Sequence, residues 1–222
     1  MRIYHGSEDI IIKPNYELGK PNKDFGRGFY CTQDIERAKE WACKNNKNGI
    51  VNEYEINTDE LKILDLTSNK YNILNWISIL LKNRSFNTEN QNSFNAKKFL
   101  IKNYYVEINK YDLVIGYRAD DSYFSYAQNF IENSLSIESL ERAMKLGNLG
   151  KQVVLVSEKA FKNIKYVNNY QVDKNVYYSK FKDNDLIARK NYKKLSSNKN
   201  DTYVIDLIRK GKTKWAHTIN VI

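Results

Sequence analysis

Residues 24–32 read Asp-Phe-Gly-Arg-Gly-Phe-Tyr-Cys-Thr, and they follow an earlier segment, residues 4–7, that reads Tyr-His-Gly-Ser. The alternating pattern of residues 3–12 predicts a first strand, and residues 28–32 predict a short second strand. A glycine directly after His5 permits a ligand to approach the backbone closely. A lone histidine on a strand is also commonly structural. The two segments therefore indicate a site only in combination with other residues.

The rest of the chain predicts short strands mixed with helices. Because the strands and helices do not alternate regularly, an α+β fold is favoured over a doubly wound sheet. Further strands are expected at residues 51–56, 61–66, 113–116 and 152–156. Helices are expected at residues 32–44 with Thr32 as N-cap, 69–81, 96–109, 122–132, 137–146, 157–161 with Ser157 as N-cap, 176–195 and 201–210.

Composition limits the classes of protein that fit. The chain has 222 residues and a net charge of +10. This charge suits an anionic partner, although the codon bias of an AT-rich genome explains it more simply. No apolar run reaches the roughly 20 residues of a membrane span and no secretory signal is visible, so we expect a cytoplasmic protein without a membrane partner. Two cysteines and two histidines exclude a disulfide framework and the common zinc patterns, so no metal is expected.

The segments at residues 4–7 and 24–32 indicate a family when they are taken together. His5-Gly6 followed by Gly-Arg-Gly-Phe-Tyr at residues 26–30 resembles the ADP-ribosyltransferase superfamily, in the histidine-tyrosine-glutamate branch that includes diphtheria toxin and the poly(ADP-ribose) polymerases. Trp41 stands eleven positions after Tyr30, where the polymerases carry the aromatic residue that closes the nicotinamide pocket. Over residues 3–165 the chain is similar to a bacterial family known as domain of unknown function 3990. That similarity includes residues 115–116 followed by 119–121, and residues 152–154 followed by 157–160.

The resemblance implies an ADP-ribosyltransferase-like split β-sheet with an NAD cleft over residues 1–169, and NAD as the co-substrate. A basic helical extension, residues 170–222, is expected to pack on the same domain. The implied catalytic residues are His5, Tyr30 and Gln152. The implied NAD-binding residues are His5, Gly6, Ser7, Gly28, Tyr30 and Trp41.

Each implied role has a physical basis and an alternative. Nicotinamide is a flat, partly charged ring that binds well between aromatic faces, which Tyr30 and Trp41 would supply. Its carboxamide needs one donor and one acceptor, which the Gly6 backbone offers. His5 would hold a ribose hydroxyl. The alternative for Tyr30 and Trp41 is packing in the core, because Trp41 lies on the apolar stripe of its predicted helix.

Gln152 departs from the branch's pattern, since the matching residue there is a glutamate that binds the nicotinamide ribose. A glutamine can still bond a hydroxyl, but it cannot act as a general base or place a negative charge near a developing cation. This argues against chain elongation and leaves single transfer. Glu158 lies six residues further on, roughly 20 Å along a strand, and cannot serve the same ribose. Ala38 stands where the polymerases carry a serine that bonds the carboxamide.

These residues favour an enzyme, a mono-ADP-ribosyltransferase that modifies a protein or nucleic acid. The resemblance also suggests a bacterial toxin or defence effector, with an antitoxin or immunity protein as a further partner. An NAD glycohydrolase and a non-catalytic protein that binds ADP-ribose or nucleic acid remain as alternatives. Asp120 and Asp121 are interpreted as a helix cap with a solvated neighbour, or as groups that orient the acceptor. His217 is interpreted as non-catalytic.

Overall fold

The strands form two sheets that meet along one edge. In the computed structural model, which describes residues 1–119, 121–145, 150–194 and 200–210, the first sheet has the strand order β1-β3-β7 and is antiparallel throughout. The second has the order β2-β6-β5-β4, in which only β4 and β5 run parallel. The strands are β1 (Arg2–Ser7), β2 (Phe29–Cys31), β3 (Gly49–Ile56), β4 (Ile63–Asp65), β5 (Leu113–Tyr117), β6 (Lys151–Leu155) and β7 (Ile164–Val172).

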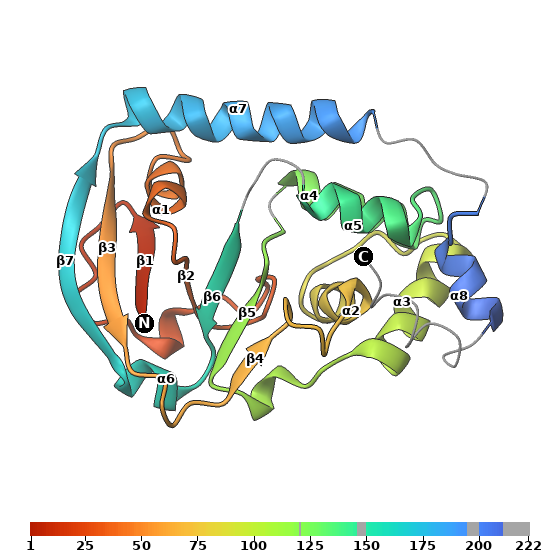
Figure 1. Cartoon of the computed structure of the whole chain (residues 1–222), viewed down its shortest axis with the longest axis horizontal. Helices are drawn as coiled ribbons and strands as arrows, with labels where there is room; N and C mark the ends of the chain where they lie inside the picture. Colours follow the sequence, from red (N-terminus) through yellow and green to blue (C-terminus); the bar gives the residue numbers. More distant parts are fainter. Residues whose placement is uncertain (120, 146–149, 195–199, 211–222) are drawn as a thin grey trace.

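The helices cover the sheets unevenly. Figure 1 shows α1 beside β1, a group of helices on the far side of β4 and β5, and α7 running from the end of β7 across to α4 and α5. The α-helices are α1 (Ile35–Ala42), α2 (Ile73–Asn83), α3 (Gln91–Tyr104), α4 (Asp121–Ile131), α5 (Ile137–Lys145), α6 (Glu158–Lys162), α7 (Lys174–Tyr192) and α8 (Val204–Lys210). Two short 3₁₀ helices are η1 (Tyr16–Leu18) and η2 (Ile108–Lys110). The mixture confirms the α+β prediction.

The two sheets are joined by one bridge. The Tyr4 amide donates to the Thr32 carbonyl over 2.7 Å, and the Thr32 amide donates to the Tyr4 carbonyl over 2.9 Å. Because this bridge is antiparallel, residues 5–7 of β1 lie on the side of Tyr30 and Phe29 of β2, yet no further backbone hydrogen bond joins the two strands among the described residues. The two sheets therefore part directly after their only bridge among the described residues.

Apolar side chains fill three regions. The largest cluster lies between the second sheet and the helices, where Val114 and Val154 pack with Leu74, Trp76 and Phe130. A second cluster lies between the two sheets, and a third lies between α1 and the first sheet. The layers on both sides of β6 explain why its residues 153–155 are buried on both faces.

The start of α1 differs from the prediction. The N-cap is Asp34, whose carboxylate accepts from the backbone amides of Glu36 and Arg37 at 2.9 and 3.4 Å. Thr32 instead accepts a bond from the Asp34 amide. The expectation that Thr32 caps the helix was wrong because Thr32 belongs to the bridge between the sheets. The Ser157 cap of α6 is confirmed by its bond from the Ala160 amide.

The first strand ends at Ser7 and not at residue 12, and β7 was missed altogether. The register of β7 on β3 shifts between Glu53 and Tyr54, which pair with Asn168 and Tyr166. The residue between these two partners has no counterpart on β3, so the side chains of β7 do not alternate in a simple way. A boundary at residues 169/170 therefore falls inside a strand of the first sheet. The chain beyond β7 still packs on the same core, because Val204 and Leu207 of α8 and Ala188 of α7 are buried there.

Among the described residues, no helix combines the length and the apolar character needed to cross a bilayer.

Candidate functional site

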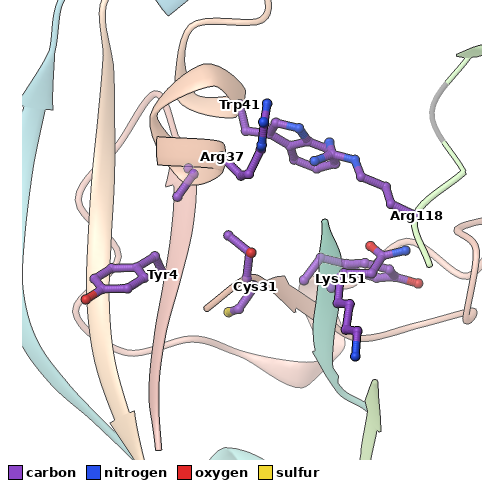
Figure 2. A pocket seen from close by; sticks show the side chains of 11 residues that line it. Tyr4, Cys31, Arg37, Trp41, Arg118 and Lys151 are labelled. Carbon is purple, nitrogen blue, oxygen red and sulfur yellow. The ribbon is translucent and has the colours of Figure 1, made fainter. Parts of the chain in front are cut away.

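A cavity lies where the two sheets part (Figure 2). It is a small cavity that is partly open to solvent. Its walls come from β1, β2, α1, β6 and the segment after β5. The lining residues are Tyr4, Gly6, Tyr30, Cys31, Thr32, Arg37, Ala38, Trp41, Arg118, Lys151 and Gln152. Four of the implied site residues, Gly6, Tyr30, Trp41 and Gln152, thus reach one cavity from four separate elements.

Gly6 is constrained on two sides. A Cβ on Gly6 would lie 2.7 Å from the Ala42 backbone nitrogen and even nearer to the Ala38 carbonyl, so only glycine lets α1 pack this closely on β1. Alternate residues of a β-strand direct their N–H and C=O groups to the same side. Because Tyr4 directs both groups at Thr32, Gly6 directs both groups to that same side, beyond the bridge. The α-carbon of Gly6 faces α1, whereas its backbone donor and acceptor face the cavity.

Tyr30 is held by its hydroxyl. The phenol donates to the Gly26 carbonyl at 2.7 Å and accepts from the Phe25 amide at 3.0 Å. Burial raises the pKa of Tyr30, so the hydroxyl stays protonated at neutral pH. Both bonds anchor the ring to the loop before β2, so its orientation is fixed. Tyr30 packs against the largest apolar cluster and also lines the cavity, so the core-packing alternative holds for it in part. Cys31 is no nucleophile here at neutral pH, because burial raises the pKa of its thiol.

Trp41 lines the cavity and belongs to none of the apolar clusters. It is half-buried on α1, while Ala38 and Ala42 make the contacts of that helix with the first sheet. Figure 2 shows Arg118 reaching across the cavity from the segment after β5 to the Trp41 ring, which its guanidinium contacts. An indole face is in general able to receive a flat cation.

Gln152 is buried at the start of β6, and its amide orientation is determined by its neighbours. Its Nε2 donates to the Asp24 carboxylate at 3.0 Å and to the Tyr117 carbonyl at 3.2 Å. Reversing the amide would place its oxygen against two acceptors, which is unfavourable. The two N–H groups are thus both used, and Oε1 is the group that remains for a ligand.

His5 lies beside the cavity without being among its lining residues. Its ring stacks on Phe29 with centroids 4.4 Å apart, and Nδ1 lies 2.7 Å from the Tyr30 carbonyl. Because a carbonyl only accepts, Nδ1 carries the proton and Nε2 is an acceptor in the neutral ring. Burial lowers the pKa of His5, and the bond to Tyr30 opposes that shift only in part. The neutral ring therefore predominates at pH 7.

Cationic groups line the rest of the cavity. Arg37 is held by Glu40 through contacts of 2.8 and 2.9 Å, and Glu40 in turn accepts from Asn184 of α7 at 3.0 Å. Lys151 donates to the Thr67 hydroxyl over 2.8 Å. Together with Arg118, these groups make the cavity suited to an anionic ligand.

Ser7 and Gly28 do not line the cavity. The Ser7 hydroxyl bonds the Asp9 carbonyl and accepts from Asn52 at 3.0 Å. A Cβ on Gly28 would lie 2.6 Å from the Leu155 carbonyl, so this glycine serves the close approach of its loop to β6. Glu158 lies in α6, as expected. Asp120 and His217 lie outside the described residues, and Asp121 begins α4.

Asp24, Arg37, Arg84 and Arg118 were not predicted from the sequence to have a role in the site. Asp24 and Arg84 form an ion pair over 2.9 Å beneath Gln152. Asp24 stands two residues before the Gly-Arg-Gly segment, and that proximity was the one signal available. Nothing in the local sequence indicates Arg84 or Arg118, because their partners Asp24 and Trp41 lie far away along the chain. Arg37 pairs with Glu40 three residues further on, which is an ordinary helix pair and no sign of a site.

Comparison with known proteins assigns the chain to a family. The chain belongs to the family described as protein of unknown function (DUF3990), whose model matches residues 1–166. The matched segment supplies every residue that lines the cavity and ends within β7. No curated protein and no solved structure matches the chain.

Trp41 and Trp76 allow a matched test of the cavity. Trp76 is 1% exposed in the largest cluster, so Trp76→Ala should lower the free energy of unfolding by about 3–5 kcal/mol. Trp41→Ala should lower it by under about 1 kcal/mol, because Trp41 packs in no cluster. Urea unfolding followed by circular dichroism measures both. Equal losses would place Trp41 in the core.

His5 should make stability depend on pH. Its folded pKa is lower than its ordinary value of 6.5, so the unfolded chain binds the proton more readily. The contribution of neutral His5 to the free energy of unfolding is therefore complete above about pH 6.5 and is lost as the pH falls through the folded pKa. Between pH 7.5 and 5.5, wild type should lose more stability than His5→Asn, which keeps a donor for the Tyr30 carbonyl without titrating. Parallel stability curves for the two proteins would contradict this.

Proposed function

We propose that the protein is an NAD-dependent mono-ADP-ribosyltransferase that modifies a protein or nucleic acid. The observation that carries the proposal is the meeting of Gly6, Tyr30, Trp41 and Gln152 at one cavity, with His5 directly beside it. The strands and the helix that supply them are far apart in the sequence. Core packing alone gives no reason for them to share a cavity.

Each group fits a part of NAD. The Gly6 amide and carbonyl suit the two polar ends of the carboxamide, and the anchored Tyr30 ring and the Trp41 indole suit the two faces of nicotinamide. Nε2 of neutral His5 suits a ribose hydroxyl. The two-sheet arrangement, which parts after a single bridge, is consistent with the split sheet of the ADP-ribosyltransferase superfamily.

The reaction breaks the bond between the ribose and nicotinamide, and nicotinamide leaves with the electron pair. The acceptor's nucleophilic atom then bonds the ribose carbon and loses its proton. The transition state resembles an oxocarbenium ion, so protein atoms that accept hydrogen bonds from the ribose hydroxyls can stabilise it. Gln152 Oε1 and His5 Nε2 would take this part. Arg118 occupies the Trp41 face, so nicotinamide would replace its guanidinium there. The released guanidinium, with Arg37 and Lys151, would suit the diphosphate of NAD.

Labelled NAD tests the activity. Purified protein incubated with NAD labelled in the adenine and with a bacterial lysate should transfer label to protein or nucleic acid. Label found only as free ADP-ribose would instead make the protein an NAD glycohydrolase. Absence of turnover would reduce the cavity to a binding site. If transfer occurs, the labelled acceptor identifies the macromolecular partner, and a neutralising antitoxin or immunity protein can be sought by co-expression.

Gln152→Ala tests the proposed role of the amide oxygen. The variant should abolish transfer while NAD still binds, because only an interaction that strengthens in the transition state changes the rate of the chemical step. Isothermal titration calorimetry measures binding and the labelled-NAD assay measures transfer. The matched control is Gln171→Ala, a glutamine on the exposed face of β7 that should leave both unchanged. Transfer by Gln152→Ala at the wild-type rate would contradict the role.

A further inference from the structure

Asp24 is a buried carboxylate at the meeting point of three segments. Its Oδ1 accepts from Arg84 Nη1 at 2.9 Å, and its Oδ2 accepts from the Ala119 amide at 2.9 Å and from Gln152 Nε2 at 3.0 Å. Its own carbonyl accepts from Asn83 at 3.1 Å. Burying a carboxylate is costly unless it is paired and bonded, and here every bond comes from a neighbour of the cavity or from the end of α2.

The consequence for Gln152 follows from the chemistry of an amide. A glutamine amide offers two N–H donors and one oxygen acceptor, and by itself it can turn either end toward a ligand. Asp24 takes one N–H and the Tyr117 carbonyl takes the other. A bond to a charged acceptor is stronger than one to a neutral acceptor, so Asp24 contributes the larger share of this preference.

We infer that Asp24 is the positioning residue of this site: it locks the Gln152 amide so that only Oε1 can face a ligand. Gln152 then presents an acceptor, as a glutamate oxygen would, while the negative charge resides one hydrogen bond further away. This inference rests on the proposed function for its catalytic consequence, but the lock itself is a property of the folded protein.

The other polar and charged groups around Asp24 and Gln152 are consistent with the fixed orientation of the amide. Arg84 balances Asp24 from the end of α2, and its guanidinium also donates to the Ala119 carbonyl at 2.8 Å. The Tyr30 hydroxyl stays protonated, because burial raises its pKa. Arg118 and Lys151 line the cavity beside Gln152. A second carboxylate at position 152 would face Asp24 at about 3 Å, which disfavours ionisation of both groups together. The site is therefore built for glutamine and not for the glutamate of the related branch.

The lock is tested first without any activity. In an NMR spectrum of protein labelled with ¹⁵N, the Gln152 side-chain amide should show slow exchange with solvent, and Gln152→Glu identifies its signals by their disappearance. Asp24→Asn should speed the exchange of the Gln152 amide protons, most of all that of the proton bound to Asp24. The matched control is Glu53→Gln, which removes a buried carboxylate paired with Arg2 at 3.1 Å in the other sheet. It should leave the Gln152 signals unchanged.

The catalytic consequence is tested by exchanging the donor and the acceptor of the hydrogen bond between positions 152 and 24. Asp24→Asn should lower kcat of the labelled-NAD reaction about tenfold or more, with KM for NAD changed less than twofold. Gln152→Glu should also lower it, through repulsion from Asp24. The double variant Asp24→Asn with Gln152→Glu restores a donor facing an acceptor between positions 24 and 152 but leaves the Tyr117 carbonyl without its donor, so it should be more active than Gln152→Glu alone. If the role of Asp24 is merely structural, the fold losses of kcat in the two single variants should multiply in the double variant.

The two proposals fail in different ways. Slow amide exchange that survives in Asp24→Asn overturns the lock, whether or not the protein turns over NAD. A double variant no more active than Gln152→Glu alone overturns the catalytic consequence. If NAD is not consumed by wild type but Asp24→Asn releases the amide, the proposed transferase fails and the lock stands. Urea unfolding of each variant identifies any that does not fold. If Asp24→Asn does not fold, Arg84→Lys takes its place, because it weakens the ion pair that holds the Asp24 carboxylate.

Discussion

The two hydrogen bonds between Tyr4 and Thr32 are the interaction on which the site depends. Among the described residues they are the only backbone pairing between the first sheet and the second, and the backbones of the two sheets part immediately beyond it. Gly6 lies two residues past Tyr4, so its backbone donor and acceptor point toward the side of β2, where β2 no longer pairs with β1. The absence of a side chain at Gly6 lets α1 pack closely and brings Trp41 to the cavity beside Gly6. One bridge and one glycine thus create the cavity.

Two polar networks hold the walls around this opening. On one side Asp24 connects the loop before β2 with Arg84, Ala119 and Gln152. On the other side Asn184 of α7 holds Glu40, which holds Arg37 at the cavity. The second network reaches beyond residue 166, where the family match ends. The helix α7 therefore supports the site as well as covering the fold.

The sequence predicts those parts of this protein that local chemistry controls. The apolar cores of β5 and β6 and the Ser157 cap can be read from adjacent residues, and the helix at residues 73–83 follows from its apolar spacing. The strand β7 could not be predicted, because its bulge removes the alternation on which such a prediction relies. In the site, His5, Gly6, Tyr30 and Trp41 came from a resemblance. Asp24 could not be found, because its partners Arg84 and Gln152 stand 60 and 128 positions away.

The most direct measurement of the central claim is an NMR titration of the protein with nicotinamide. The account predicts that the backbone amide of Gly6 and the indole N–H of Trp41 shift together and saturate at one concentration, because both groups would contact the same ring. The backbone amide of Val51, the residue paired with Gly6 on β3, should shift less, and the indole of the buried Trp76 should not move. If Gly6 and Trp41 stay unchanged at saturating nicotinamide while the protein is folded, the cavity is not a nicotinamide site and the account is wrong.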